Sequence, residues 1–299
     1  MGFDVSNLGS YIDNNGTKYV MASIADAPTA KALIAGGNVQ YGVKGQAAIL
    51  KLNSGVAPYK ITGSCGRIGG TAVALSDVVI TVNQIRDEAN LCPEALHNTF
   101  YAKAVQAGLN DSEEQLMGDF VAALMENRAL KIAEFNEKVL WQGDTTLTGS
   151  TYLNIINGIN KQVTTSVSTS GATVVEKLQN FFLACDPVVR TQADFTIAVG
   201  QDVYSEYLIA LSNKNLYHPT EDKTLYGTVA KLFPTSGLNG TRKVIGIRFD
   251  NIQLGLDGKN DGEKASIKYS IETNQIYQDF AYALGVAVVY PTESVYTTV

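Results

Sequence analysis

A single helical pattern of about 30 residues runs without interruption through the middle of this chain. Ser112 and Gln115 form a capping box at its start, and Gly143 follows its last helical residues. One apolar stripe recurs at helical spacing, with Arg128 as its only break. The stripe comprises Met117, Val121, Leu124, Ile132, Phe135 and Val139. The predicted helix, residues 112–142, is roughly 45 Å long, more than most globular domains need.

Strand-like runs and glycine-rich turns precede this helix. Residues 46–52 and 56–62 flank the turn-forming tripeptide at 53–55, which predicts a long hairpin with a tight turn there. Residues 78–82 are rich in valine and isoleucine, and we expect a strand that is buried on both faces. A further helix is predicted for residues 95–107.

Strands and helices are mixed in the second half of the chain. Thr173 and Glu176 form a second capping box, and Asp186-Pro187 stops the helix that follows it. The predicted helices are 174–182 and 202–212, and the predicted strands are 195–199, 244–249, 252–256, 267–271 and 280–290. This mixture predicts an α+β fold.

Charge is scarce and unevenly distributed. Only 17% of the residues are charged and the net charge is −6, which argues against a protein whose main task is to grip nucleic acid phosphates. Residues 36–76 contain no acid but carry Lys44, Lys51, Lys60 and Arg67. The long helix has an excess of acids, including Glu126, Glu134 and Glu137. Either this asymmetry is chance, or the two regions attract each other between subunits.

The residues suggest no catalytic, cofactor or metal site. His97 and His218 are far apart in sequence, and neither has a neighbour at ligand spacing. Residues 257–262 resemble a calcium loop, but Lys259 places a cation where an oxygen ligand belongs, so two tight turns explain them better. Phosphate-binding and nucleophile-elbow motifs are absent from the sequence. We therefore expect a protein that is not an enzyme and binds no cofactor or metal.

Targeting signals are also missing from the sequence. The first residues lack the basic and apolar regions of a secretion signal, and three widely spaced cysteines suit a reducing compartment. The longest nearly apolar run, residues 281–290, is about half of the ~20 residues that a membrane helix requires. We expect a soluble intracellular protein without a membrane partner.

The order of these elements resembles the major capsid protein of tailed bacteriophages, whose Hong Kong 97-type fold also occurs in herpesvirus capsid floors and encapsulins. An N-terminal arm, a long hairpin and a strand lead into a long spine helix. Three short segments add to the resemblance: Glu-Lys-Val-Leu-Trp-Gln-Gly-Asp at 137–144, Asn-Gly-Ile at 157–159, and a terminal strand with Phe280, residues 285–288 and Pro291.

This resemblance implies an α+β Hong Kong 97-type fold with four regions. They are an N-terminal arm (1–35), an extended hairpin loop (36–76), a peripheral domain (77–150 and 262–299) containing the spine helix at 112–142, and an axial α/β domain (151–261). The hairpin loop would reach over a neighbour's spine helix. The inter-subunit contact candidates are Lys44, Lys51, Lys60, Arg67, Glu126, Glu134 and Glu137.

The implied function is structural. Copies of the chain would form hexamers and pentamers of an icosahedral shell around double-stranded DNA, without sequence-specific binding. Scaffolding, portal and decoration proteins are possible partners, and the virion, assembled in the host bacterial cytoplasm, is the implied location. The sequence opens at Met1 without the helical scaffolding segment of many relatives, which favours a separate scaffolding protein.

Three alternatives remain open on the sequence. An encapsulin-type compartment would share the fold but enclose protein cargo. A β-rich surface or adhesion protein would account for the Thr, Ser and Asn content and for the sequons at Asn15, Asn110 and Asn239. An enzyme is the third alternative, and no residue pattern recommends it.

Overall fold

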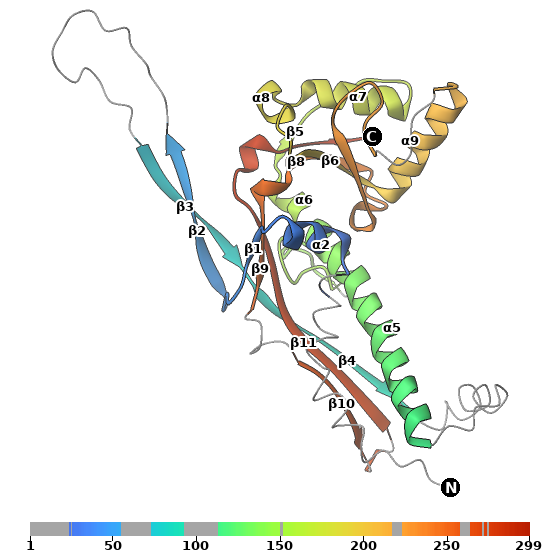
Figure 1. The fold of residues 1–299 in the computed structure, drawn as a ribbon. Helices are drawn as coiled ribbons and strands as arrows, with labels where there is room; N and C mark the ends of the chain where they lie inside the picture. The colour runs from blue at the N-terminus through green and yellow to red at the C-terminus, as the bar shows by residue number, and fades with distance from the viewer. Residues whose placement is uncertain are drawn as a thin grey trace, which may run out of the picture.

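The computed structural model describes residue 24 and residues 26–54, 73–92, 113–149, 152–216, 223–257, 264–270, 272–273 and 275–299. These parts form two five-stranded sheets, a two-stranded ribbon and several helices (Figure 1). One sheet runs along the longest helix, and the other lies at the C-terminal end of that helix. The predicted α+β class is confirmed.

The long helix α5 extends from Glu113 to Gln142, which confirms the helix predicted at 112–142. In the predicted apolar stripe, Ile132 and Val139 are buried, whereas Leu124 and Phe135 are half-buried. Other buried residues of this helix are Met125, Ala129, Ala133, Leu140 and Trp141. None of the described helices is long and apolar enough to cross a membrane.

Arg128 interrupts the apolar stripe because a strand of the neighbouring sheet supplies a carboxylate. Its Nε and Nη2 atoms donate to the two Asp87 carboxylate oxygens, each over 2.6 Å. The two side chains are about one-third exposed, so this bidentate pair is partly shielded from water. Further along the same interface, the Tyr282 hydroxyl donates to Asn136 Oδ1 over 2.6 Å, and burial raises the pKa of that tyrosine.

The sheet beside α5, here called the long sheet, is built on one strand. Its strands are β1 (Val39–Gln40), β4 (Asn83–Leu91), β9 (Ile252–Leu256), β10 (Lys264–Ser270) and β11 (Gln275–Val288). β11 pairs antiparallel with β4 along one edge and with β10 and β9 along the other, and β1 pairs parallel with β9. Phe280 and Tyr282 of β11 are fully buried in the same apolar cluster as Met125 and Ile132 of α5.

The other sheet, here called the mixed sheet, contains parallel and antiparallel pairs in the order β5-β12-β8-β6-β7. Its strands are β5 (Thr165–Ser166), β6 (Phe195–Gly200), β7 (Lys231–Thr235), β8 (Lys243–Arg248) and β12 (Val295–Thr298). Helices α7 (Val174–Ala184) and α9 (Gln201–Asn213) pack on one face, where Ile197 and Val199 point. The opposite face, with Ala198 and Ile245, packs against Trp141 of α5.

Short helices connect the sheets and cap their edges. They are α2 (Pro28–Ala35), α6 (Ile159–Gln162), α8 (Pro187–Arg190), η2 (Ser236–Leu238), η3 (Phe249–Asn251) and η4 (Pro291–Glu293). The Thr173 half of the capping box predicted at the start of α7 is confirmed, because Thr173 Oγ1 accepts from the backbone N–H of Glu176. The Glu176 carboxylate accepts from the backbone N–H of Ala172, one residue before the predicted donor. Asp186 ends that helix and caps α8, since its carboxylate accepts from Val188 N over 2.7 Å.

The hairpin differs from the prediction in its turn. β2 (Gln46–Ser54) pairs antiparallel with β3 (Val73–Thr81) to form the two-stranded ribbon, and Ser54 lies opposite Val73. The tight turn predicted at 53–55 is therefore wrong, and residues 55–72 connect the strands. The turn signal depends only on residues 53–55, whereas the partner of β2 is decided by pairing along all nine of its residues. That partner is β3, which is distant in sequence. The strand predicted at 56–62 and the helix at 95–107 lie outside the described residues.

The strand predicted at 78–82 is buried on one face only. Ile80 is fully buried, but Val79 is 49% exposed. Only one face of the ribbon is covered by the described residues. On that face Ile80 and Val82 pack on Ala283 and Ala287 of β11. Gly285 permits this crossing, because a Cβ atom there would lie 2.2 Å from the Thr81 carbonyl oxygen.

The sheets do not follow the predicted domain bounds at three strands. β1, placed by sequence in the extended hairpin loop, pairs with β9 in the long sheet. β9, placed by sequence in the axial domain, pairs with β11 of the long sheet. β12, placed in the peripheral domain, pairs with β8 of the mixed sheet. Within the predicted arm, residues 28–35 form α2, which buries Thr29, Ala30 and Leu33. The four-region division itself stays a prediction.

Candidate functional site: the ribbon, the long helix and the junction between the sheets

The ribbon carries the described basic candidates. Lys44 is exposed near its base, and Lys51 is half-buried with its Nζ atom 4.6 Å from the ring centroid of Tyr290. Lys60 and Arg67 lie outside the described residues. The ribbon extends beyond the acid-free segment to Asp77, which is exposed opposite Leu50 and offsets part of the positive charge.

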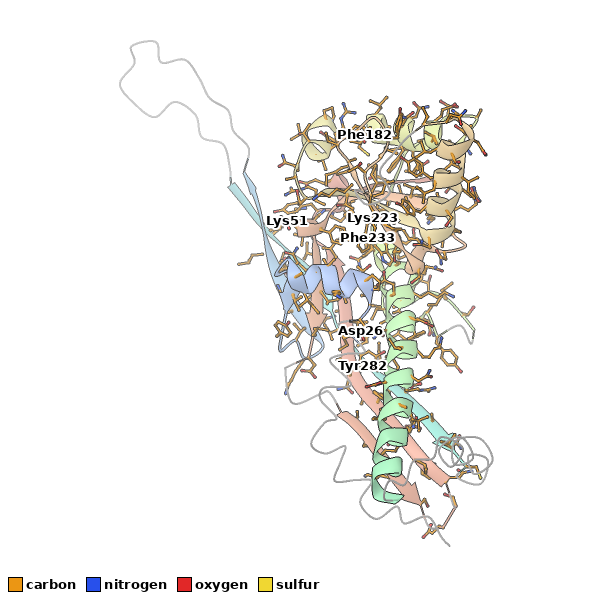
Figure 2. The ribbon with its side chains drawn as sticks, turned by 45° about the vertical axis from the view of Figure 1, so that its right-hand side comes forward. Asp26, Lys51, Phe182, Lys223, Phe233 and Tyr282 are labelled. Atoms are coloured by element: carbon orange, nitrogen blue, oxygen red, sulfur yellow. The ribbon has the colours of Figure 1, made fainter. Side chains whose placement is uncertain are left out.

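Within one chain, the structure does not bring the ribbon to the acidic face of α5. The ribbon leaves the long sheet and points away from that helix (Figures 1 and 2). Glu126 and Glu134 are exposed on α5, and Glu134 forms an ion pair with Lys131 over 2.9 Å. Both side chains of that pair are more than 60% exposed, so the pair contributes little stability and leaves Glu134 accessible to another partner.

Glu137 was predicted to contact another subunit, but its side chain is fully buried inside its own chain. Its carboxyl oxygens accept hydrogen bonds from Thr29 N (2.9 Å), Thr29 Oγ1 (2.5 Å), Trp141 Nε1 (3.2 Å) and Thr235 Oγ1. A residue enclosed in this way offers no surface to a neighbouring subunit. The sequence indicates this burial, because apolar residues stand at helical spacing on both sides of Glu137. Ala133 lies four residues before it, and Leu140 and Trp141 lie three and four residues after it, on the same helix face.

These contacts join three separate parts of the fold, and we call Glu137, Thr29, Trp141 and Thr235 the Glu137 cluster. Thr29 belongs to α2, Glu137 and Trp141 belong to α5, and Thr235 ends β7 of the mixed sheet. Trp141 Nε1 also donates to Thr29 Oγ1 over 2.7 Å. The four hydrogen bonds compensate for the loss of water around a buried carboxyl group.

Close backbone packing surrounds the Glu137 cluster. A Cβ atom at Gly237 would lie 2.3 Å from Trp141 Cδ1 and 2.5 Å from the Glu137 carbonyl oxygen, so only glycine fits beside the helix. Gln142 Nε2 donates to the Gly237 carbonyl oxygen over 2.5 Å. The end of α5 is therefore held against the mixed sheet by side-chain and backbone contacts together.

The chain beyond α5 is tied back by a second polar group. Asp144 accepts from the Thr146 hydroxyl over 2.6 Å and from Lys161 Nζ over 2.9 Å. The Thr146 hydrogen bond and then Lys161 lower the pKa of the Asp144 carboxyl to about 2. Gly158 N donates to the Gly143 carbonyl oxygen over 2.8 Å, which brings the start of α6 back to the end of α5.

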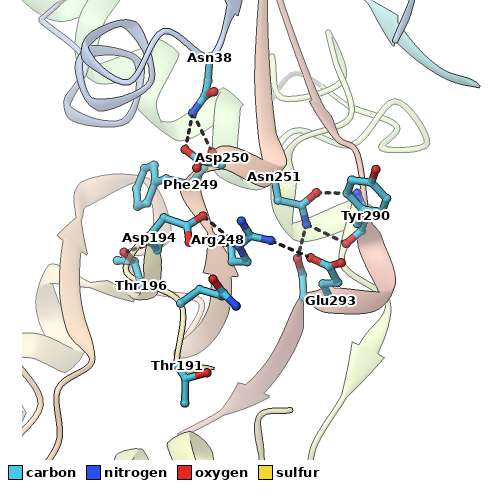
Figure 3. Close-up of polar contacts among 12 residues, drawn as sticks. Asn38, Thr191, Asp194, Thr196, Arg248, Phe249, Asp250, Asn251, Tyr290 and Glu293 are labelled. Atoms are coloured by element: carbon cyan, nitrogen blue, oxygen red, sulfur yellow. Dashed lines mark hydrogen bonds and ion pairs between the residues drawn. The ribbon is translucent and has the colours of Figure 1, made fainter. Parts of the chain in front are cut away.

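Two further passages of the chain cross between the sheets side by side (Figure 3). Residues 249–251 lead from β8 to β9, and residues 289–294 lead from β11 to β12. Asn251 Oδ1 accepts from Tyr290 N over 2.6 Å, and Asn251 Nδ2 donates to the Tyr290 carbonyl oxygen over 2.8 Å. Nearby, Arg248 pairs with Asp194 over 2.9 Å and with Glu293 over 3.5 Å.

The described residues show no group of three or more His, Cys, Asp and Glu side chains that could hold a metal ion. Cys185 is buried, and this burial raises the pKa of its thiol to about 12, so the nucleophilic thiolate is suppressed at neutral pH. Cys92 is exposed after the end of β4. The features that stand out are therefore surfaces and junctions.

Comparison with known proteins gives a likeness in structure alone. No protein-family model and no curated protein sequence matches the chain. A chain of the satellite phage P4 procapsid, solved with the size determination (Sid) protein, superposes with a TM-score of 0.60 at 10% identity over 94% of this chain and 90% of that one.

Other solved particles show the same arrangement. A chain from the capsid of an empty GTA particle has a TM-score of 0.57 at 10% identity, covering 87% of this chain and 86% of its own. A chain of the virus-like particle from Pyrococcus furiosus has a TM-score of 0.52 at 10% identity, covering 94% and 96%. The chain therefore has the fold found in these capsid and particle structures, which confirms the resemblance at the level of the fold.

Replacing Glu137 tests the internal cluster. Glu137→Gln replaces one carboxyl oxygen, which accepts hydrogen bonds, by an amide NH₂ group, which donates them. A donor that now binds this oxygen then faces another donor, and we expect the free energy of unfolding to fall by about 2 kcal/mol. Glu134→Gln is the matched control, since it makes the same change on the exposed face and should shift stability by less than about 0.5 kcal/mol. Urea unfolding measures both; equal effects would contradict the structural role of Glu137.

Proposed function

We propose that this chain is a major capsid protein that assembles with copies of itself into hexamers and pentamers of an icosahedral shell around double-stranded DNA. The observation that carries the proposal is the likeness to a phage procapsid chain over 94% of the present chain. A likeness of this extent spans most of the chain rather than one common motif.

The exposed apolar surface supports a protein that is covered by other subunits. Leu50 is 78% exposed and Val79 is 49% exposed, on the ribbon face that the described residues leave uncovered. In the register of the ribbon, Ala48 lies directly opposite Val79, and both are nearer the base than Leu50. Contiguous apolar groups on a projecting element are typical of an interaction surface. The low charge of the whole chain agrees with extensive subunit contacts.

The proposed contact joins the ribbon of one copy to α5 of another. Its basic side is Lys44, Lys60 and Arg67, and its acidic side is Glu126 and Glu134. Glu137 is left out because it is buried, and Lys51 because its Nζ atom faces the ring of Tyr290 in its own chain. Opposite charges on the two elements would steer subunits together and favour one register. Since the ribbon points away from α5 in its own chain, this pairing needs a second copy.

Location and further partners belong to the same proposal. The shell would be part of a virion, assembled in the host bacterial cytoplasm with the help of scaffolding and portal proteins, and with decoration proteins on its outside. A net charge of −6 suits a lining that encloses DNA without gripping it. An encapsulin-type shell is the alternative with the same fold, and its content would be protein.

Electron microscopy of the full chain tests the proposal. We expect closed particles of uniform diameter when the chain is expressed with its scaffolding protein, or alone if it needs none. Nuclease digestion and absorbance ratios of particles from infected cells then separate a DNA-filled shell from one that holds protein. Monodisperse monomers under all assembly conditions, scaffold included, would contradict a shell function.

Charge reversal tests the proposed contact between the ribbon and the helix. We expect Lys44→Glu with Lys60→Glu to weaken assembly, because like charges then face each other across the interface. Glu126→Lys with Glu134→Lys should restore part of it in the same chain. The readout is the assembled fraction in velocity sedimentation, compared at about 0.05 M and about 0.3 M salt, where screening differs.

The control for this series is Lys231→Glu, which reverses an exposed charge in the mixed sheet. It changes the net charge without touching the ribbon or α5, so assembly should be unaffected. If the reversed ribbon assembles as well as the unmodified chain at low salt, electrostatic docking of the ribbon on α5 is wrong.

A further inference from the structure

The ribbon is held at a second place beyond its base. At the base, Ile80 and Val82 pack on the long sheet. Lys51 lies five residues further along β2 than Gln46, roughly 17 Å at about 3.4 Å per residue. There its Nζ atom lies 4.6 Å from the ring centroid of Tyr290, within the range of cation–π attraction. Figure 2 shows Lys51 on the ribbon beside the junction of the two sheets.

The backbone of Tyr290 is fixed where the chain crosses between the sheets (Figure 3). Asn251 binds both its N–H and its carbonyl oxygen, over 2.6 Å and 2.8 Å. Val289 N donates to the Asn251 carbonyl oxygen over 2.9 Å. Asn251 lies on the other passage, directly before β9. The ring that Lys51 contacts therefore belongs to the residue that ties the two passages together.

We propose that Tyr290 couples the direction of the ribbon to the angle between the long sheet and the mixed sheet. If the ribbon swings about its base, Lys51 leaves the ring of Tyr290, and the junction loses one of its contacts. Conversely, a change of angle at the junction moves the ring and releases Lys51. Such coupling is reciprocal, because either change alters the same contact free energy.

The coupling rests on contacts within one chain and does not require the proposed shell function. In an assembled shell it would have a consequence, however: a neighbour that bound the ribbon would bias the angle between the sheets of the subunit it touched. Binding of the ribbon by one neighbour would thereby change the shape that the subunit presents to the next neighbour. Testing the unassembled chain keeps the two proposals separate.

Amide hydrogen exchange of the full, unassembled chain gives the first test. Lys51→Met keeps an unbranched side chain of similar reach and removes the cation. We expect exchange at the Val289 and Tyr290 amides to become about two- to fivefold faster, the effect of losing one cation–π contact. Lys44→Met is the matched control, because it removes an exposed cation near the ribbon base and should leave both amides unchanged.

The reciprocal test replaces the ring and observes the ribbon. Tyr290→Leu removes the aromatic face but keeps the backbone groups that bind Asn251. Spin labels at Ala48→Cys on the ribbon and Ser212→Cys on α9, with the native cysteines replaced, report the distance between the ribbon and the mixed sheet. We expect a broader distance distribution in Tyr290→Leu than in the chain with Tyr290.

Two results would overturn the coupling. One is an unchanged exchange rate at Val289 and Tyr290 in Lys51→Met, with faster exchange confined to β2 and β3. The other is an unchanged label distance in folded Tyr290→Leu. If Tyr290→Leu does not fold, the exchange result for Lys51→Met decides alone, since that substitution is at a partly exposed position.

Discussion

The buried carboxyl group of Glu137 is the contact on which the arrangement of the two sheets depends. It receives hydrogen bonds from α2, from its own helix and from the end of β7, so three parts of the chain meet at one side chain. Uncompensated burial of such a group is costly, and this keeps its donors in place. Away from this cluster, Arg128 and Asn136 hold the long sheet against the same helix. The helix thus serves as the common support of both sheets.

With both sheets fixed on α5, the surfaces left for other molecules are limited. The ribbon packs one face on β11 and exposes Leu50 and Val79 on the other. The acidic face of α5 exposes Glu126 and Glu134. The ribbon runs away from α5 within one chain (Figure 1), which is the geometry expected when each element meets its counterpart on another copy. The proposed shell uses both of them, and the junction at Tyr290 lies between the ribbon and the mixed sheet.

The sequence predicted the elements that depend on local pattern. The bounds of α5 and the Thr173 cap follow from helix periodicity and capping, which act over a few residues. The turn predicted at 53–55 was wrong because strand pairing is nonlocal. A turn-forming tripeptide does not prevent β2 from pairing with a distant strand, here β3, which begins at Val73. Glu137 was misassigned because it was counted with the acids of the helix and not placed on its buried face. The pairing of Asn251 with Tyr290, distant in sequence, had no local signal.

Glu137 anchors α5 inside each chain, and we propose that the exposed acids of the same helix bind the ribbon of another copy. A high-resolution electron cryomicroscopy reconstruction of assembled particles would show both contacts at once. We expect Glu137 to contact Thr29 and Thr235 of its own chain, and a neighbour's ribbon to cover Glu126 and Glu134 within about 4 Å. A map in which the ribbon lies elsewhere, or in which Glu137 faces another subunit, would show that this arrangement is wrong.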